Sequence, residues 1–316
     1  MTTVTSAALH VLSWQGVFLA PDFVSPSEVS ILRNLGKHIR NVQPLTAQNR
    51  GNLTEAFFLD EYLPLQSSVP SFTAELESRI TNITGIPYHR DETSLLFTSQ
   101  KPLLNPPSSV AYLHHDKNGR ERRTVTMLLY LTTTKKDEDG GHTIFPSLPR
   151  ALADPMTSVS SLAEKTTEHD SSVGQKLPKG WRTPSNEIAN IAKRLTRGFK
   201  KGHYSMTDGS YGNPRDIWDR TAFKMVQKEC NLARSGRNHA LAVKPKAGDA
   251  VFFWSSYPDG RSNPLMFHTA CVAVSGGSRE AIQKFKEPVR SGHLNDFKEA
   301  VGGGGVQSEE FVGNEL

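Results

Sequence analysis

The chain has 316 residues, a net charge of +5 at pH 7 and 36% hydrophobic residues. This length exceeds the commonest domain size but suits a single β-rich domain that carries insertions. No apolar run is long enough to cross a bilayer, and the first residues lack the basic and apolar regions of a signal peptide, so we expect no membrane span and a cytoplasmic protein. The positive charge is spread along the chain without a recognisable nucleic-acid module, which favours a basic surface or an acidic protein substrate over a nucleic-acid partner.

The first hundred residues predict two helices that flank a sheet. After a flexible N-terminus at residues 1–12, Ser25-Pro26-Ser27-Glu28 combines an N-cap serine, a proline at the first helical position and a glutamate that completes a capping box. This first helix should run to about Gly36. A second helix is indicated by apolar residues that share one face and by a terminating glycine and proline: Phe72, Leu76, Ile80, Ile83, Gly85 and Pro87. The strand series should open between Glu92 and Phe97.

From Phe97 onward, segments of strand composition alternate with Gly, Pro and Asp turns, without long crossover helices. This pattern predicts an antiparallel jelly roll, a mostly β fold with flanking helices. Residues 150–225 interrupt the pattern as an insertion, which we expect to lie outside the barrel and to govern substrate choice. It should contain a short amphipathic helix, indicated by Asn186, Ile188, Ile191, Ala192 and Leu195. The whole domain should span residues 13–300, followed by a disordered tail at 301–316.

Two short motifs predict a metal site: Leu113-His114-His115-Asp116 and Met266-Phe267-His268-Thr269. Side chains two apart on a strand point to the same face, so His114 and Asp116 can turn inward together while His115 faces away. With His268 from a second strand they would supply two imidazoles and one carboxylate, the ligand set of non-haem Fe(II) oxygenases. These ligand types also suit zinc, but a zinc hydrolase would need a general base, and nothing in the sequence marks one.

The site motifs belong to an ordered series along the chain. It runs through His114-His115-Asp116, Arg123-Thr124-Val125-Thr126, Gly140-Gly141-His142-Thr143-Ile144-Phe145-Pro146, Pro245-Lys246-Ala247-Gly248-Asp249-Ala250-Val251-Phe252-Phe253 and His268-Thr269-Ala270-Cys271. This series resembles the prolyl 4-hydroxylase branch of the Fe(II)/2-oxoglutarate dioxygenases. The resemblance implies a double-stranded β-helix (jelly roll, cupin-like), with Fe(II) held by His114, Asp116 and His268. It also implies 2-oxoglutarate and O2 as cosubstrates, and ascorbate to rescue oxidised iron.

The resemblance further implies which residues contact 2-oxoglutarate. The family grips the far carboxylate with a lysine ten residues after the distal histidine, where this chain has Ser278, so Arg279 is the expected anchor and a surface arginine is the alternative. Thr143 should line the same pocket. Phe97 stands where the family has a tyrosine, and Tyr112 is the candidate to supply the missing hydroxyl. Supporting roles behind the strand are expected for Arg123 and Thr126, and a solvated position for His142.

The function that these motifs favour is hydroxylation of peptidyl proline in a protein or peptide substrate, as in a procollagen-proline 4-dioxygenase, with coupled decarboxylation of 2-oxoglutarate to succinate and CO2. Two alternatives stay open: the same oxygenase chemistry on another side chain or a nucleic acid, and a catalytically silent jelly-roll binding module. The resemblance also admits the endoplasmic reticulum as the compartment. Sequence alone does not show whether Cys230 and Cys271 pair.

Overall fold

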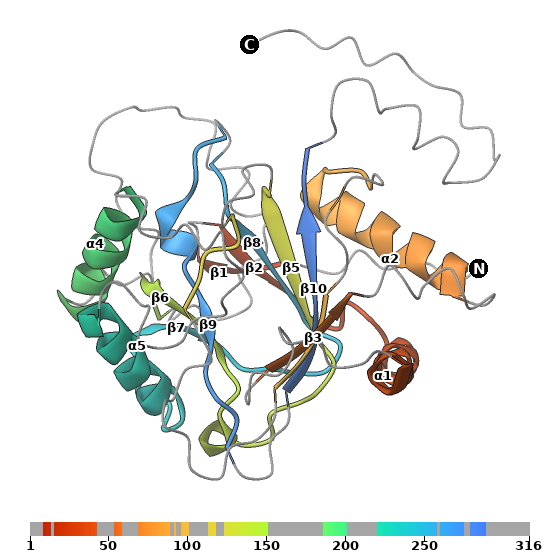
Figure 1. Cartoon of the computed structure of the whole chain (residues 1–316), viewed down its shortest axis with the longest axis horizontal. Coiled ribbons are helices and arrows are strands. Elements are labelled where there is room, and N and C mark those ends of the chain that lie inside the picture. The colour runs from red at the N-terminus through yellow and green to blue at the C-terminus, as the bar shows by residue number, and fades with distance from the viewer. Residues whose placement is uncertain are drawn as a thin grey trace, which may run out of the picture.

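The computed structural model describes residues 9–13, 16–42, 54–58, 69–88, 92, 96–100, 113–117, 123–150, 186–200, 220–257, 260–274 and 279–288. Two antiparallel sheets form its centre (Figure 1). The larger has the strand order β1-β2-β8-β5-β10-β4-β3 and the smaller the order β7-β6-β9. The larger sheet comprises β1 (His10–Ser13), β2 (Val17–Ala20), β3 (Thr54–Phe58), β4 (Leu96–Gln100), β5 (Val125–Tyr130), β8 (Ala250–Trp254) and β10 (Arg279–Lys286). The smaller comprises β6 (Thr143–Pro149), β7 (Ala240–Val243) and β9 (Thr269–Ala270).

The two sheets bury one apolar layer between them. Leu128, Tyr130 and Phe253 of the larger sheet pack with Phe145 and Leu241 of the smaller one. Their neighbours along the strands, such as Met127 and Leu129, belong to a separate cluster on the other face of the larger sheet. This alternation makes both faces of β5 apolar, because one face meets the second sheet and the other meets helices. The result is the predicted mostly β, double-stranded β-helix fold with flanking helices.

Helices α1 (Pro26–Val42) and α2 (Val69–Thr84) cover the outer face of the larger sheet. The backbone N–H of Ser25 donates to the Glu28 carboxylate at 2.7 Å, and the Glu28 N–H donates to the Ser25 hydroxyl at 3.3 Å, which confirms the predicted capping box. Helix α2 ends at Gly85, whose φ of +68° is the left-handed conformation that favours glycine. The prediction for α1 was wrong at its end, since the helix continues past Gly36.

A buried cluster of ion pairs connects α2 to the same sheet. Lys284 of β10 lies 2.9 Å from Glu77 of α2 and 3.0 Å from Glu92, and Lys286 lies 2.7 Å from Glu92. Burial disfavours charges, but two lysines and two glutamates compensate one another here. Burial raises the pKa of Glu92, although the two ammonium groups oppose the shift. Burial alone would lower the pKa of Lys284, but its two glutamates outweigh that effect and raise the pKa above its usual value.

Helices α4 (Asn186–Lys200) and α5 (Arg220–Ala233) cover the outer face of the smaller sheet (Figure 1). Ile188 and Ile191 of α4 are fully buried and pack with Val226 of α5 and Ile144 of β6. The amphipathic helix predicted within residues 150–225 is therefore present. The two helices supply the apolar cover that the smaller sheet requires, so this part of the insertion is structural as well as peripheral.

Three expectations need correction or lie outside the described residues. The strand series does not open near Glu92, because β1, β2 and β3 precede it and extend both edges of the larger sheet. Strand β1 also begins at His10, inside the stretch expected to be a flexible N-terminus. The expected tail at 301–316 lies outside the described residues. Within the described residues there are also two short 3₁₀ helices, Asp137–Asp139 and Pro264–Met266.

Candidate metal centre

The backbone places His114 and His268 opposite each other. The His114 N–H donates to the His268 carbonyl oxygen at 3.1 Å, and the His268 N–H donates to the His114 carbonyl oxygen at 3.0 Å. This is a hydrogen-bonded antiparallel pair, in which the two side chains leave the sheet on the same face. Their ring centroids are accordingly 4.2 Å apart. Residues separated by more than 150 positions are thus brought together by one β-bridge.

Asp116 completes the cluster from the strand position two residues after His114. Its Oδ1 lies 3.2 Å from Nε2 of His114, and its Oδ2 lies 3.7 Å from Nε2 of His268. The three residues offer one ligand atom each, and these atoms all lie within 4.8 Å of one another. Two imidazole nitrogens and one carboxylate oxygen on one face of an ion fit a mononuclear Fe(II) site that keeps positions open for substrate.

The protonation states suit metal binding. Nδ1 of His268 donates to the Met266 carbonyl oxygen at 3.0 Å, which leaves Nε2 unprotonated and directed at the cluster. Burial lowers the pKa of His268 to about 3, so the ring is neutral at physiological pH. Burial alone would raise the pKa of Asp116, but His268 and His114 and the hydrogen bond from Thr126 hold it well below its usual range. A neutral imidazole and an ionised carboxylate are the forms that bind a divalent cation.

His115 is directed away from the cluster, as strand alternation predicts. It is buried, its Nε2 lies 2.9 Å from the carbonyl oxygen of Asn263, and its ring packs edge-on against Phe267. The backbone N–H of Lys117 donates to its Nδ1 at 3.2 Å. Burial lowers the pKa of His115. It is therefore a neutral core histidine whose two ring nitrogens both have protein partners.

The Asp116 carboxylate has two further partners, neither of which sequence analysis placed in the site. Thr126 of β5 donates from its hydroxyl to Oδ2 at 2.7 Å, and Gln283 of β10 donates from Nε2 to Oδ1 at 3.2 Å. Arg123 donates to the Asp116 backbone carbonyl at 3.1 Å. The expectation that Thr126 supports the strand from behind is therefore wrong, since its side chain enters the site. Strand alternation could have indicated this, because Thr126 shares a face with Leu128 and Tyr130 of the interior layer.

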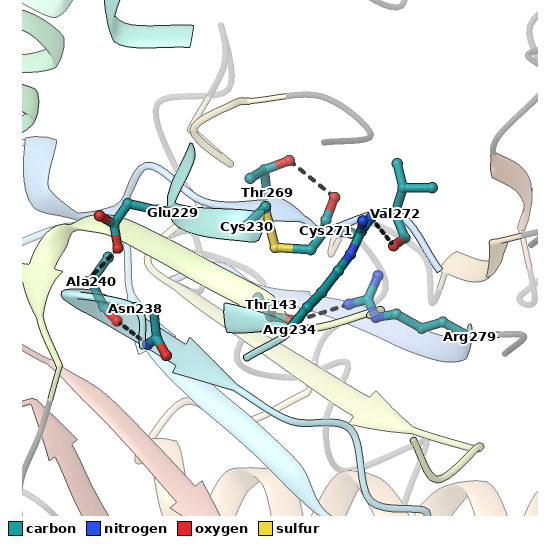
Figure 2. Close-up of a disulfide and its surroundings, with 11 residues drawn as sticks. Thr143, Glu229, Cys230, Arg234, Asn238, Ala240, Thr269, Cys271, Val272 and Arg279 are labelled. Atoms are coloured by element: carbon teal, nitrogen blue, oxygen red, sulfur yellow. Dashed lines mark hydrogen bonds between the residues drawn. A yellow bond between two sulfur atoms is a disulfide. The ribbon is translucent and has the colours of Figure 1, made fainter. Parts of the chain in front are cut away.

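Two of the residues expected to hold 2-oxoglutarate, Arg279 and Thr143, lie together in a second buried group, where Nη2 of Arg279 donates to Oγ1 of Thr143 at 2.9 Å (Figure 2). The Tyr130 hydroxyl donates to the same oxygen at 2.7 Å. Arg279 is only 8% exposed, so the alternative of a surface arginine is wrong. Burial lowers the pKa of Arg279 and raises that of Tyr130, with each group opposing the other's shift. A cation and two hydroxyls in a buried place are suited to a carboxylate ligand.

Tyr130 supplies a hydroxyl that sequence reasoning placed elsewhere. The candidate for this role was Tyr112, which lies outside the described residues, as does Ser278. Tyr130 is the last residue of β5, a strand of mostly apolar residues. Its sequence therefore predicted only a position in the core and gave no sign of a role for the hydroxyl. His142 also differs from expectation: it is 4% exposed instead of solvated, and burial lowers its pKa to about 4.

Gly140, the first glycine of the motif that leads into β6, stands where a larger side chain would not fit. A Cβ on Gly140 would lie 2.4 Å from the carbonyl oxygen of Val272, and its φ is +75°. Any larger residue would push the chain after His268 away from the turn that leads into β6. Gly140 thus allows the segment that carries Thr143 to approach the segment that carries His268.

A disulfide joins the insertion to the strand of the distal histidine (Figure 2). Cys230 of α5 is bonded to Cys271, three residues after His268, and both are fully buried. The backbone N–H of Cys271 donates to the His142 carbonyl oxygen at 2.7 Å. Arg234, the residue directly after α5, donates to the Val272 carbonyl oxygen at 3.3 Å. Helix α5 and the residue after it are therefore tied covalently and by a hydrogen bond to the segment that follows the metal cluster.

Comparison with known proteins identifies the family. Residues 107–286, more than half of the chain, match the model of the 2OG-Fe(II) oxygenase superfamily. The chain is 22% identical to Prolyl 4-hydroxylase 1 of Arabidopsis thaliana over 298 residues, covering 89% of this chain and 73% of that protein. It is 42% identical over 45 residues to Probable prolyl 4-hydroxylase 10 of the same plant, covering 14% of this chain and 15% of that protein.

Solved structures with a similar backbone include the viral collagen prolyl hydroxylase of Paramecium Bursaria Chlorella virus-1 in complex with 2OG. The sequence identity is 13% and the TM-score 0.43, and the match covers 89% of this chain and 99% of the viral one. HygX from Streptomyces hygroscopicus, with nickel and 2-oxoglutarate bound, matches at 14% identity and a TM-score of 0.43, covering 88% and 85%.

The chain belongs to the 2OG-Fe(II) oxygenase superfamily, as a member similar to prolyl 4-hydroxylases. It is accordingly a dioxygenase with Fe(II) as its metal and 2-oxoglutarate as its cosubstrate. Within the described part of the chain, no helix combines the length and apolar character needed to cross a membrane.

Proposed function

We propose that this protein hydroxylates peptidyl proline, using Fe(II), O2 and 2-oxoglutarate. The observation that carries the chemistry is the convergence of His114, Asp116 and His268, whose ligand atoms lie within 4.8 Å of one another. Similarity to Prolyl 4-hydroxylase 1 over most of the chain supports proline in a protein or peptide as the substrate. The complete donor set argues against a catalytically silent module, because such a module would have no need for a neutral buried histidine beside an ionised carboxylate.

Each group of residues has a separate role in the proposal. His114, Asp116 and His268 would hold Fe(II), which when bound would supply the redox chemistry for O2. Two electrons would come from the decarboxylation of 2-oxoglutarate to succinate and CO2 and two from the substrate C–H bond, with one oxygen atom entering succinate and the other the hydroxylated carbon. Arg279 would pair with the far carboxylate of 2-oxoglutarate, with Thr143 and Tyr130 donating hydroxyl hydrogens to it. Burial of Asp116 and His268 would exclude water from their side of the metal. Ascorbate would keep the iron reduced.

The protein's surroundings form part of the same proposal. The buried Cys230–Cys271 disulfide supports an oxidising compartment such as the endoplasmic reticulum over the cytoplasm, where thiols are kept reduced. We also propose that the chain from β1 onward forms one dioxygenase domain whose insertion at residues 150–225, which contains α4 and the start of α5, contributes to the choice of substrate.

The deciding experiment measures succinate formation by the Fe(II)-loaded protein with a panel of proline-rich peptides, together with the mass of each peptide product. A gain of one oxygen atom on proline, with one succinate per hydroxylated residue, is the expected result. Asp116→Ala is the matched control, since it removes the carboxylate ligand and should abolish both products. Succinate formation that no proline peptide stimulates, but that another peptide or a nucleic acid does, would keep the oxygenase chemistry and refute the substrate.

A further inference from the structure

Among the described residues, Gln283 is the contact of Asp116 that joins the metal cluster to β10, the strand that carries Arg279. Strand β10 carries Arg279 and Gln283 on the same face, four residues apart, and Gln283 donates to Asp116 Oδ1 at 3.2 Å. The opposite face carries Lys284, which is directed to Glu77 of α2. The strand register therefore fixes both inward side chains relative to the cluster.

Exposure distinguishes Gln283 from the other residue that holds the carboxylate. Thr126 is fully buried, and Asp116 is 2% exposed. Gln283 is partly exposed, like His114. The site thus meets solvent on the side of these two residues, and Gln283 holds Asp116 from that side while Thr126 holds it from within.

The carboxamide of Gln283 has hydrogen-bonding groups to spare. One N–H is used by Asp116, which leaves a second N–H donor and a carbonyl acceptor. Across the residues that the structure describes, neither of these groups has a partner. A donor and an acceptor on one planar amide complement the N–H and C=O of a peptide backbone, and the amide carries no charge that would have to be neutralised.

We propose that Gln283 does two things: it positions the Asp116 carboxylate for the metal, and its free amide edge binds the backbone of the peptide substrate beside the reacting proline. The second part rests on the proposed function; the first does not. One side chain then links substrate binding to the orientation of a metal ligand. Binding of the peptide would further restrict the carboxamide to the rotamer that donates to Asp116, so the competent geometry would be favoured more strongly when substrate is present.

The positioning role is tested by metal binding alone, without turnover. Gln283→Leu keeps the side-chain volume but removes the donor, and Gln283→Met keeps the length of the side chain and likewise removes the donor. Both should weaken Co(II) binding, measured by calorimetry on the protein without cosubstrate, by about tenfold, as for other groups that orient metal ligands. Thr126→Val is the matched control, because it removes the other side chain that donates to the Asp116 carboxylate, and it should weaken Co(II) binding to a similar extent. An unchanged Co(II) dissociation constant in both folded Gln283 variants would overturn the positioning role.

The recognition role is tested by separating KM from kcat with a peptide of alternating alanine and proline as the probe, because proline alone has no backbone N–H to donate. Gln283→Leu should raise the KM for this peptide about three- to tenfold, as expected for one or two neutral hydrogen bonds. Thr126→Val, which is buried away from solvent, should lower kcat and leave this KM unchanged. Equal KM values for the wild type and Gln283→Leu would overturn recognition. If the wild type hydroxylates no proline peptide, the proposed function fails and recognition falls with it, whereas the Co(II) measurement still decides the positioning role.

Discussion

Removal of the Arg279 guanidinium should weaken 2-oxoglutarate binding while the metal centre survives. The guanidinium is 8% exposed and donates to Thr143, which also accepts from Tyr130. A carboxylate placed here would be buried, and a buried carboxylate without a cationic partner is costly. Loss of a charge-assisted hydrogen-bonded pair costs about 1.5–3 kcal/mol, which corresponds to roughly ten- to a hundredfold in affinity.

The assay is the KM for 2-oxoglutarate in succinate formation, with Co(II) affinity measured in parallel. Arg279→Gln should raise the KM by that factor and leave the Co(II) dissociation constant unchanged, because Arg279 makes no contact with the three ligand residues among its described interactions. Arg279→Lys should recover part of the loss, since it restores the charge but not the paired donors.

Arg33→Gln is the matched control for a change of charge near the same strand. Arg33 is on α1 and pairs at 2.9 Å with Glu280, the neighbour of Arg279 that points to the opposite face of β10. This variant should leave the KM for 2-oxoglutarate unchanged. A normal KM in Arg279→Gln, or an equal rise in Arg33→Gln, would show that the anchor has been assigned to the wrong residue.

Three more outcomes follow from the contacts. Cys230→Ser should lower the free energy of unfolding by about 4 kcal/mol, because the disulfide closes a loop across a separation of 41 residues. The measurement is urea denaturation without reductant. Equal stability of the variant and the wild type would show that the disulfide does not stabilise the fold. Burial lowers the pKa of His142 to about 4 in the folded state, so as pH falls below about 6.5 the unfolded chain takes up this proton first. The free energy of unfolding should therefore drop by about 3 kcal/mol between pH 7 and pH 4. In His142→Gln the drop should be smaller. His115→Ala should lower the melting temperature without changing Co(II) affinity, whereas His268→Ala should abolish Co(II) binding; loss of binding in both would contradict the assignment of His115 to the core.

The sequence predicted the metal cluster because its signals are local. His114 and Asp116 share a face through strand alternation, and His268 stands in an ordered motif of its own. The contacts of Gln283 and Tyr130 could not be predicted in the same way. They depend on β10 pairing with β5 in the register that places Gln283 opposite Leu128, and such long-range pairing leaves no mark in either segment.

The insertion shows a different limit. Its amphipathic helix was predicted from apolar periodicity, but the periodicity does not say which surface receives that face. In the structure Ile188 and Ile191 pack on the smaller sheet, and α5 adds a disulfide beside the strand of His268. Deletion of residues 150–225 would consequently uncover an apolar sheet face, so loss of hydroxylation in such a deletion would report on stability as well as on substrate choice.

Strand β10 shows how burial on one side of a sheet secures chemistry on the other. A slip of one residue would turn Arg279 and Gln283 outward and bring Glu280 and Lys284 into the interior. The outer face resists that slip, because Lys284 and Lys286 are held in a buried cluster with Glu77 and Glu92, and a buried charge that loses its partner costs about 3–5 kcal/mol. This cluster touches neither the metal ligands nor the cosubstrate anchor among the described contacts. Its charges nevertheless specify the register, and the register decides which side chains face Asp116 and Thr143.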